Sequence, residues 1–187
     1  MADKDRKPGK LAQKIKNPRA YLNDFVQNEE GGYTYSGRRY SVDRHYADYG
    51  DVYRKFLIGG IIMLAVSVGS GLIDAAGANG AFYVILPFIG EISAIFAILW
   101  NVARLISQGE VVKEYAFKKI STWLPGGASM LMYFALTGLI MSAVYIITHG
   151  FEEKAFKCVL YLALKTVTAF LAFEYKKYYN TVQWSAY

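Results

Sequence analysis

Four long apolar segments constrain this chain more than any other feature of its sequence. A hydrocarbon core of roughly 30 Å takes about 20 apolar residues of α-helix, and a helix satisfies its own backbone hydrogen bonds there. We therefore expect an all-α integral membrane protein with a bundle of four transmembrane helices. The predicted spans cover residues 56–73, 81–103, 124–148 and 156–173.

The four segments differ in how cleanly they match a transmembrane helix. The first carries no charged residue, whereas the second contains Pro87 and Glu91 and the fourth is interrupted by Lys165. The third starts at Pro125, which suits the first turn of a helix because the amides there lack helical partners. The residues before 51 contain no apolar run, so we expect the first span itself to direct insertion.

Lysine and arginine are distributed very unequally around these spans. Of the 21 basic residues, 12 precede Phe56, and the connection 104–123 and the tail 176–187 bring the count on that side to 18. The opposite side carries 2, which are Lys154 and Lys157. Because positively charged loops stay cytoplasmic, we predict a protein of the cell membrane with both termini inside. The predicted parts are a cytoplasmic region 1–55, a transmembrane domain 56–175 and a cytoplasmic tail 176–187.

Aromatic residues lie near both ends of the predicted spans, as is common at membrane interfaces. We expect an inner belt and an outer belt, in which the rings face the lipid headgroups. The inner belt would contain Trp100, Trp123, Tyr175 and Tyr178, and the outer belt Tyr83, Tyr145 and Tyr161.

The region before the first span has local patterns of its own. Asn17 and Pro18 predict the start of a short amphipathic helix that reaches Val26. Residues 32–35 and 39–42 flank a short turn and predict a β-hairpin.

Two cytoplasmic segments leave alternatives open. The basic segment 4–16 is expected to be solvated, with a membrane-surface anchor as the alternative. Val112, Tyr115, Ala116 and Ile120 have helical spacing. They indicate either a helix lying at the inner interface or an extension of the second or third span.

Glu91 and Lys165 form the strongest candidate site. Glu91 follows Phe82 by nine residues and Lys165 follows Phe156 by nine, so both lie about 13 Å below the outer end of their helices. An ionised side chain at that depth costs at least about 2.5 to 3.5 kcal/mol and seeks a partner. We predict an ion pair between the second and fourth spans. It is either a packing device or a polar site for an ion, a proton or a charged substrate.

Other residues suggest flexibility or close packing. Pro87 and Gly90 precede Glu91 and predict a kink or hinge, although proline and glycine also occur in membrane helices without such a role. His149 is expected to be an ordinary loop histidine rather than a metal ligand or pH sensor. Small residues at four-residue spacing predict close helix contacts. They are Ala65 and Gly69, Ser67 and Gly71, Gly90 and Ala94, and Gly138 and Ser142.

The sequence excludes several kinds of chemistry more clearly than it indicates one. There is no glycine-rich phosphate loop, no histidine pair of the zinc-protease type and a single cysteine, Cys158. We therefore expect no enzyme, no cofactor, no metal and no nucleic acid partner.

A transport-related membrane protein is the leading hypothesis for the function. It would be a homo-oligomer or a subunit of a larger membrane complex, with the bilayer as its other partner. The alternative is an accessory or scaffold subunit that docks a partner through its cytoplasmic N-terminal region and tail. A membrane enzyme acting on lipid is a more distant possibility.

Overall fold

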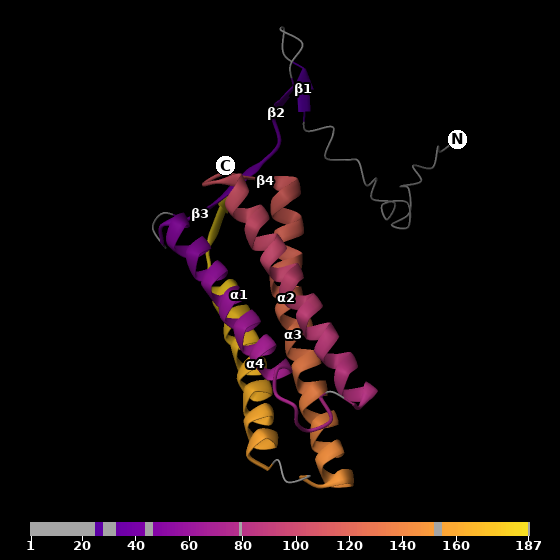
Figure 1. Ribbon diagram of the computed structural model, residues 1–187. Helices are drawn as coiled ribbons and strands as arrows, with labels where there is room; N and C mark the ends of the chain where they lie inside the picture. The colour runs from indigo at the N-terminus through magenta and orange to yellow at the C-terminus, as the bar shows by residue number, and fades with distance from the viewer. Residues whose placement is uncertain (1–24, 28–32, 44–46, 79, 152–154, 187) are drawn as a thin grey trace, which may run out of the picture. The chain divides into compact units, whose positions relative to one another are not determined.

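Four long helices make up most of the computed structural model (Figure 1). The structure describes residues 25–27, 33–43, 47–78, 80–151 and 155–186. All four helices are long and apolar enough to cross a membrane, which confirms the number and order of the predicted helical spans. They are α1 (Tyr49–Gly71), α2 (Phe82–Gln108), α3 (Glu114–His149) and α4 (Ala155–Thr181).

The helices pack as an up-and-down bundle within the compact unit formed by residues 39–187. α1 packs against α2 and α4, and α3 packs more extensively against the same two helices. Each helix therefore has its sequence neighbours beside it, as short connections favour. This order places α2 and α4 at opposite corners of the bundle.

All four helices extend beyond the predicted apolar segments, and α1, α2 and α4 do so at their polar ends. α1 begins at Tyr49 because the carboxylate of Asp48 caps it, accepting a hydrogen bond of 3.0 Å from the amide of Gly50. α2 continues to Gln108 and α4 to Thr181. The polar residues at these ends thus continue the helices past the apolar segments.

α3 begins at Glu114, so the prediction that Pro125 occupies the first turn of its helix is wrong. Ile120 and Leu124, which both precede Pro125, are fully buried, and their packing holds the helix together where proline removes one backbone bond. Glu114 and Lys118 form an ion pair of 2.5 Å, which stabilises the first turn of α3. Of the two alternatives for residues 112–120, the extension of the third span is correct from Glu114 onward, and a separate interfacial helix is wrong.

Two small antiparallel sheets accompany the helices, so the chain is mostly helical rather than all-α. β1 (Phe25–Gln27) pairs with β2 (Tyr33–Tyr35). β3 (Arg39–Val42) pairs on one side with β4 (Val112–Lys113) and on the other with β5 (Trp184–Ala186). Residues 33–35 and 39–42 are strands as predicted, but the hairpin between them is wrong because each pairs elsewhere.

The predicted amphipathic helix at 17–26 is also wrong at its end. Residues 17–24 lie outside the described residues, and so does the basic segment 4–16. Phe25 and Val26 belong to β1, where backbone pairing with β2 replaces helical hydrogen bonds.

The three-stranded sheet closes one end of the bundle, beside the start of α1 and the end of α4 (Figure 1). Tyr40 of β3 stacks on Phe117 of α3 with ring centroids 4.2 Å apart, and Trp184 of β5 packs on the same ring at 5.1 Å. Val42 and Val112 are buried in the core cluster against which Phe117 and Trp184 pack. The sheet therefore joins three distant parts of the chain: β3 before the first helix, β4 in the α2–α3 connection, and β5 after the last helix.

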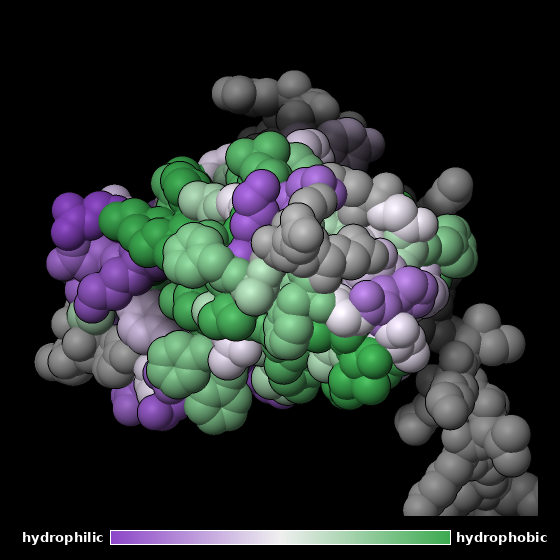
Figure 2. Space-filling model, turned by 60° about the horizontal axis from the view of Figure 1, so that its bottom comes forward, coloured by the Kyte–Doolittle hydropathy of each residue, from purple (hydrophilic) through white to green (hydrophobic). Residues whose placement is uncertain are grey.

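Large apolar side chains cover the outside of the bundle. Phe96, Ile140 and Phe170 are each about 60% exposed, and Figure 2 shows hydrophobic residues across much of one face. Trp100 and Trp123 are exposed as an aromatic belt requires. Tyr161 and Tyr175 are buried instead, so their assignment to lipid-facing belts is wrong.

Candidate functional site

Glu91 and Lys165 meet in the centre of the bundle. Nζ of Lys165 donates a hydrogen bond of 2.7 Å to Oε1 of Glu91, and both side chains are completely buried. The two residues therefore lie at the same level of the bundle, as the count of residues along the two helices predicts. Because α2 and α4 stand at opposite corners, this ion pair crosses the middle of the bundle.

Ser67 of α1 provides the second donor to the carboxylate. Its hydroxyl donates to Oε2 of Glu91 at 3.0 Å, so each carboxylate oxygen accepts one hydrogen bond. Ser70, one turn further along α1, donates its own hydroxyl to the backbone carbonyl of Ser67. A buried carboxylate needs such donors because no water solvates it.

Gly138 of α3 leaves the space that the ion pair occupies. A Cβ at this position would lie 3.3 Å from Oε1 of Glu91, 3.6 Å from Cβ of Pro87 and 4.0 Å from Cε of Lys165. Each of the four helices therefore contributes to the site: a hydroxyl from α1, a carboxylate from α2, open space from α3 and an ammonium from α4.

Two aromatic rings surround the ammonium group of Lys165. Its nitrogen lies 4.8 Å from the ring centroid of Phe88 and 5.3 Å from that of Tyr161. At these distances the faces of the rings attract a cation, and the attraction is strongest where water is excluded. Phe88 in turn rests against Gly71 of α1, where any side chain would overlap its ring.

Ser142 and Tyr161 continue the polar site toward the end of the bundle opposite the three-stranded sheet. Ser142 lies one turn after Gly138 on α3 and is fully buried. Its hydroxyl lies beside the phenol of Tyr161, but it makes no hydrogen bond of good geometry within the described part of the chain. The two hydroxyls thus place polar groups of α3 and α4 side by side within the core.

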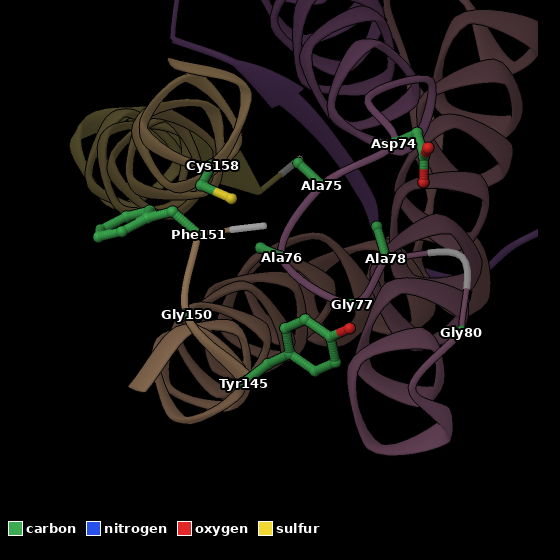
Figure 3. Close-up of a pocket in the computed structure, with 10 residues that line it drawn as sticks. All are labelled: Asp74, Ala75, Ala76, Gly77, Ala78, Gly80, Tyr145, Gly150, Phe151 and Cys158. Carbon is green, nitrogen blue, oxygen red and sulfur yellow. The ribbon is translucent and has the colours of Figure 1, made fainter. Parts of the chain in front are cut away.

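A pocket of about 270 Å³ lies beyond Tyr161 at that end. The connection between α1 and α2 forms one wall, and Tyr145 and Cys158 reach it from α3 and α4 (Figure 3). Tyr161 and Cys158 belong to the buried cluster that also holds Ala75 and Ala76 of this connection. Cys158 precedes Lys165 by seven residues, which places the pocket about 10 Å from the ion pair along α4.

The structure places the remaining predicted residues as follows. Gly90 lets the ring of Phe134 pack on α2, since a Cβ there would lie 2.6 Å from that ring. Pro87 is buried inside an uninterrupted α2, so its role as a hinge stays a prediction. His149 stacks on Tyr145 with centroids 4.4 Å apart. Within the described ranges, no three histidine, cysteine or acidic side chains are grouped to hold a metal ion.

Sequence reasoning identified the charged pair but missed most of its surroundings. Ser67, Gly138 and Ser142 were noted for small-residue spacing alone, which indicates close packing but no polar contact. Phe88 and Tyr161 carried no signal for the site. A lysine four residues after a tyrosine on one helix face is the local pattern that places Tyr161 beside Lys165.

Comparison with protein-family models, with curated proteins and with solved structures finds no match to this chain. The fold and the site together define a mostly helical four-helix bundle with a buried ion pair at its centre.

Proposed function

We propose that the chain is a multi-pass protein of the cell membrane with both termini in the cytoplasm. The distribution of polarity supports this, because large apolar groups face outward while Glu91, Lys165 and Ser142 are buried. Exposed hydroxyls on the bundle are hydrogen-bonded within their own helices, because Ser93 and Thr166 each donate to the carbonyl four residues earlier. A soluble bundle has the opposite arrangement.

The proposed orientation of the helices in the membrane rests on the distribution of lysine and arginine. The basic side of the chain, with 18 lysine and arginine residues against 2, contains the end of the bundle where the three-stranded sheet lies. A reporter fused after Tyr187 is expected to be active in the cytoplasm and silent outside the cell. Activity outside the cell would contradict this topology.

We further propose that the protein takes part in transport, with Glu91 and Lys165 as its closed polar site. The observation that carries this proposal is the position of the ion pair, which all four helices enclose about 10 Å below a pocket. An ionisable pair at mid-membrane depth is a functional site by default. Here the unsatisfied hydroxyl of Ser142 and the phenol of Tyr161 lie between the pair and the pocket.

In this proposal Lys165 acts as a tethered cation that occupies the carboxylate in the closed state. A cation or a proton that reaches Glu91 from the pocket would take the place of the ammonium group. Removing one partner alone leaves a buried charge, which costs about 3 to 5 kcal/mol. Exchange of one positive charge for another keeps the carboxylate paired. The displaced ammonium group of Lys165 is then stabilised by the faces of the Phe88 and Tyr161 rings, which already lie beside it.

Cysteine labelling tests the path from the pocket. In a Cys158→Ser background, Ser142→Cys and Tyr161→Cys are expected to react with a water-soluble thiol reagent added outside intact cells. Val159→Cys is the matched control, because this residue is 60% exposed on the outside of the bundle two positions before Tyr161. Equal reactivity of all three positions, or none at the two interior ones, would remove the aqueous path.

Flux measurements test the transport step itself. Proteoliposomes of the intact chain are expected to dissipate an imposed proton or cation gradient, and the double variant Glu91→Gln with Lys165→Met is expected to lose this activity. The double variant removes both charges and leaves neither unpaired, so loss of flux does not simply report unfolding. Unchanged flux would exclude the ion pair from the path.

The second candidate function is an accessory or scaffold subunit. The three-stranded sheet favours it, because it brings β3, the α2–α3 connection and β5 together at one end of the bundle. Inert cysteines at both interior positions, together with loss of a membrane partner after deletion of residues 1–50, would favour this function over transport.

A further inference from the structure

A groove of about 220 Å³ opens between the halves of α1 and α4 that lie nearest the three-stranded sheet. Gly59 forms its floor on α1, where a Cβ would lie 3.0 Å from Cδ2 of Tyr175. Ile62, Met63 and Leu171 line its deeper part with apolar surface. From Lys55 at its mouth to Met63 the groove follows eight residues of α1, or about 12 Å.

Tyr175 places an unsatisfied polar group in this groove. Its side chain is 6% exposed, and its hydroxyl has no hydrogen-bond partner within the described residues. The ring packs on Phe56 and Gly59, which fixes where the hydroxyl lies. This packing encloses the hydroxyl, so an acceptor from outside the chain completes the site only when the ring turns outward into the groove.

The mouth of the groove carries a positive charge. Nζ of Lys55 lies 5.7 Å above the ring of Tyr178, which is on the next turn of α4 after Tyr175. Glu174 also lines the groove, and its carboxylate is 3.8 Å from the ammonium group of Lys177. Lys55 is thus the cation that faces the opening, while the nearby acid has a partner of its own.

The chemistry changes along the groove in a fixed order. The ammonium group of Lys55 stands at the mouth over Tyr178, Tyr175 follows one helical turn deeper, and apolar walls continue from there. A phospholipid presents the complementary order, with an anionic phosphate, ester carbonyl oxygens and then an acyl chain. Basic residues at the cytoplasmic ends of membrane helices attract such headgroups.

We propose that this groove is a binding site for one anionic phospholipid of the cytoplasmic leaflet. Lys55 pairs with the phosphate, Tyr175 donates its hydroxyl to an ester carbonyl, and one acyl chain lies over Gly59 against Ile62 and Leu171. The inference requires the membrane insertion proposed above, but it is independent of transport through Glu91 and Lys165.

Native mass spectrometry of the detergent-purified full chain tests the site, with phosphatidylglycerol as the probe and phosphatidylcholine of the same chain length as its neutral counterpart. The wild-type chain is expected to retain phosphatidylglycerol at least tenfold better. Gly59→Leu fills the groove and is expected to abolish retention of both lipids. Lys55→Gln should remove the preference for the anionic lipid, and Tyr175→Phe should weaken retention of both lipids without changing the shape of the ring.

Matched variants separate the groove from general effects. Gly69→Leu adds the same side chain to α1 where no atom lies within 4 Å, so it should leave lipid retention unchanged. Arg54→Gln removes a neighbouring positive charge whose side chain faces Asp51 instead, and it should keep the preference for phosphatidylglycerol.

Equal retention of both lipids by the wild type would overturn the proposal. So would full retention by Gly59→Leu, or equal losses in Gly59→Leu and Gly69→Leu. Displacement of the bound lipid by glycerol phosphate would show that a free phosphate is recognised, and it would also overturn the proposal. The double variant Glu91→Gln with Lys165→Met should retain lipid like the wild type. The lipid measurement therefore tests the groove whether or not the protein transports ions.

Discussion

A Cβ on Gly138 would lie 3.3 Å from Oε1 of Glu91, so the carboxylate occupies space that any other residue at position 138 would fill. This contact joins α3 to an ion pair formed by α2 and α4. Gly138→Leu is expected to destabilise the protein by about 1 to 3 kcal/mol or more, because the added carbons meet buried charged groups that cannot move aside.

Thermal unfolding in detergent measures the effect of this substitution. Gly126→Leu is its control on the same helix, since no atom lies within 4 Å of a Cβ at that position. We expect little change there. Equal losses at both positions would mean that Gly138 serves the helix in general rather than the site.

A double-mutant cycle measures the coupling between the two charges. Glu91→Gln alone and Lys165→Met alone are each expected to cost about 3 to 5 kcal/mol, because each leaves one uncompensated charge in the core. The double variant should cost less than the sum and less than either single variant. Strictly additive losses in unfolding free energy would show that the two groups do not interact.

The hydrogen bond from Ser67 to Glu91 predicts a smaller, conditional effect. Ser67→Ala is expected to cost about 1.5 to 3 kcal/mol, since it removes a donor to a charged group. The same substitution should cost much less when Glu91→Gln and Lys165→Met are already present. Ser93→Ala is the control, because that hydroxyl is exposed and bonds its own helix. An undiminished cost in the double variant would contradict the assignment.

The aromatic contacts of the three-stranded sheet predict how its strands depend on each other. Trp184→Ala removes the ring that packs on Phe117 and should weaken β5. Hydrogen exchange at the amides of Ser41 and Asp43 is then expected to speed up. Ser41 pairs with Ser185 of β5, and the amide of Asp43 donates to the carbonyl of Gln183 just before β5. Trp100→Ala removes an equally large ring that is 67% exposed, and it should leave this exchange unchanged.

The sequence predicts the depth of the ion pair because depth along a helix is a matter of counting. Glu91 follows Phe82 by nine residues and Lys165 follows Phe156 by nine, and the two side chains meet. What surrounds them depends on how each helix is rotated about its axis. Apolar residues on all sides of α1 and α3 leave that rotation undetermined, so Ser67 and Gly138 could be noted as small residues but not placed at the pair.

Strand pairing shows the same limit. Alternating residues predicted strands at 33–35 and 39–42, and proximity in the sequence favoured a hairpin between them. Their partners come from elsewhere, and for β3 these are Val112 and Trp184 far along the chain. Backbone hydrogen bonds are alike for every residue type, so local sequence cannot name the partner.

Pro125 misled the prediction for a different reason. A proline followed by two glycines is a good helix start by local propensity, yet α3 begins eleven residues earlier at Glu114. Burial of Ile120 and Leu124 outweighs the single lost hydrogen bond.

The three-stranded sheet also sets an order for biosynthesis. Its middle strand, β3, is synthesised before any of the four helices, whereas β4 follows α2 and β5 follows α4. Until β5 emerges, β3 has an open edge of the kind that promotes aggregation. The side of β3 that pairs with β5 can therefore be covered only after all four helices have been made.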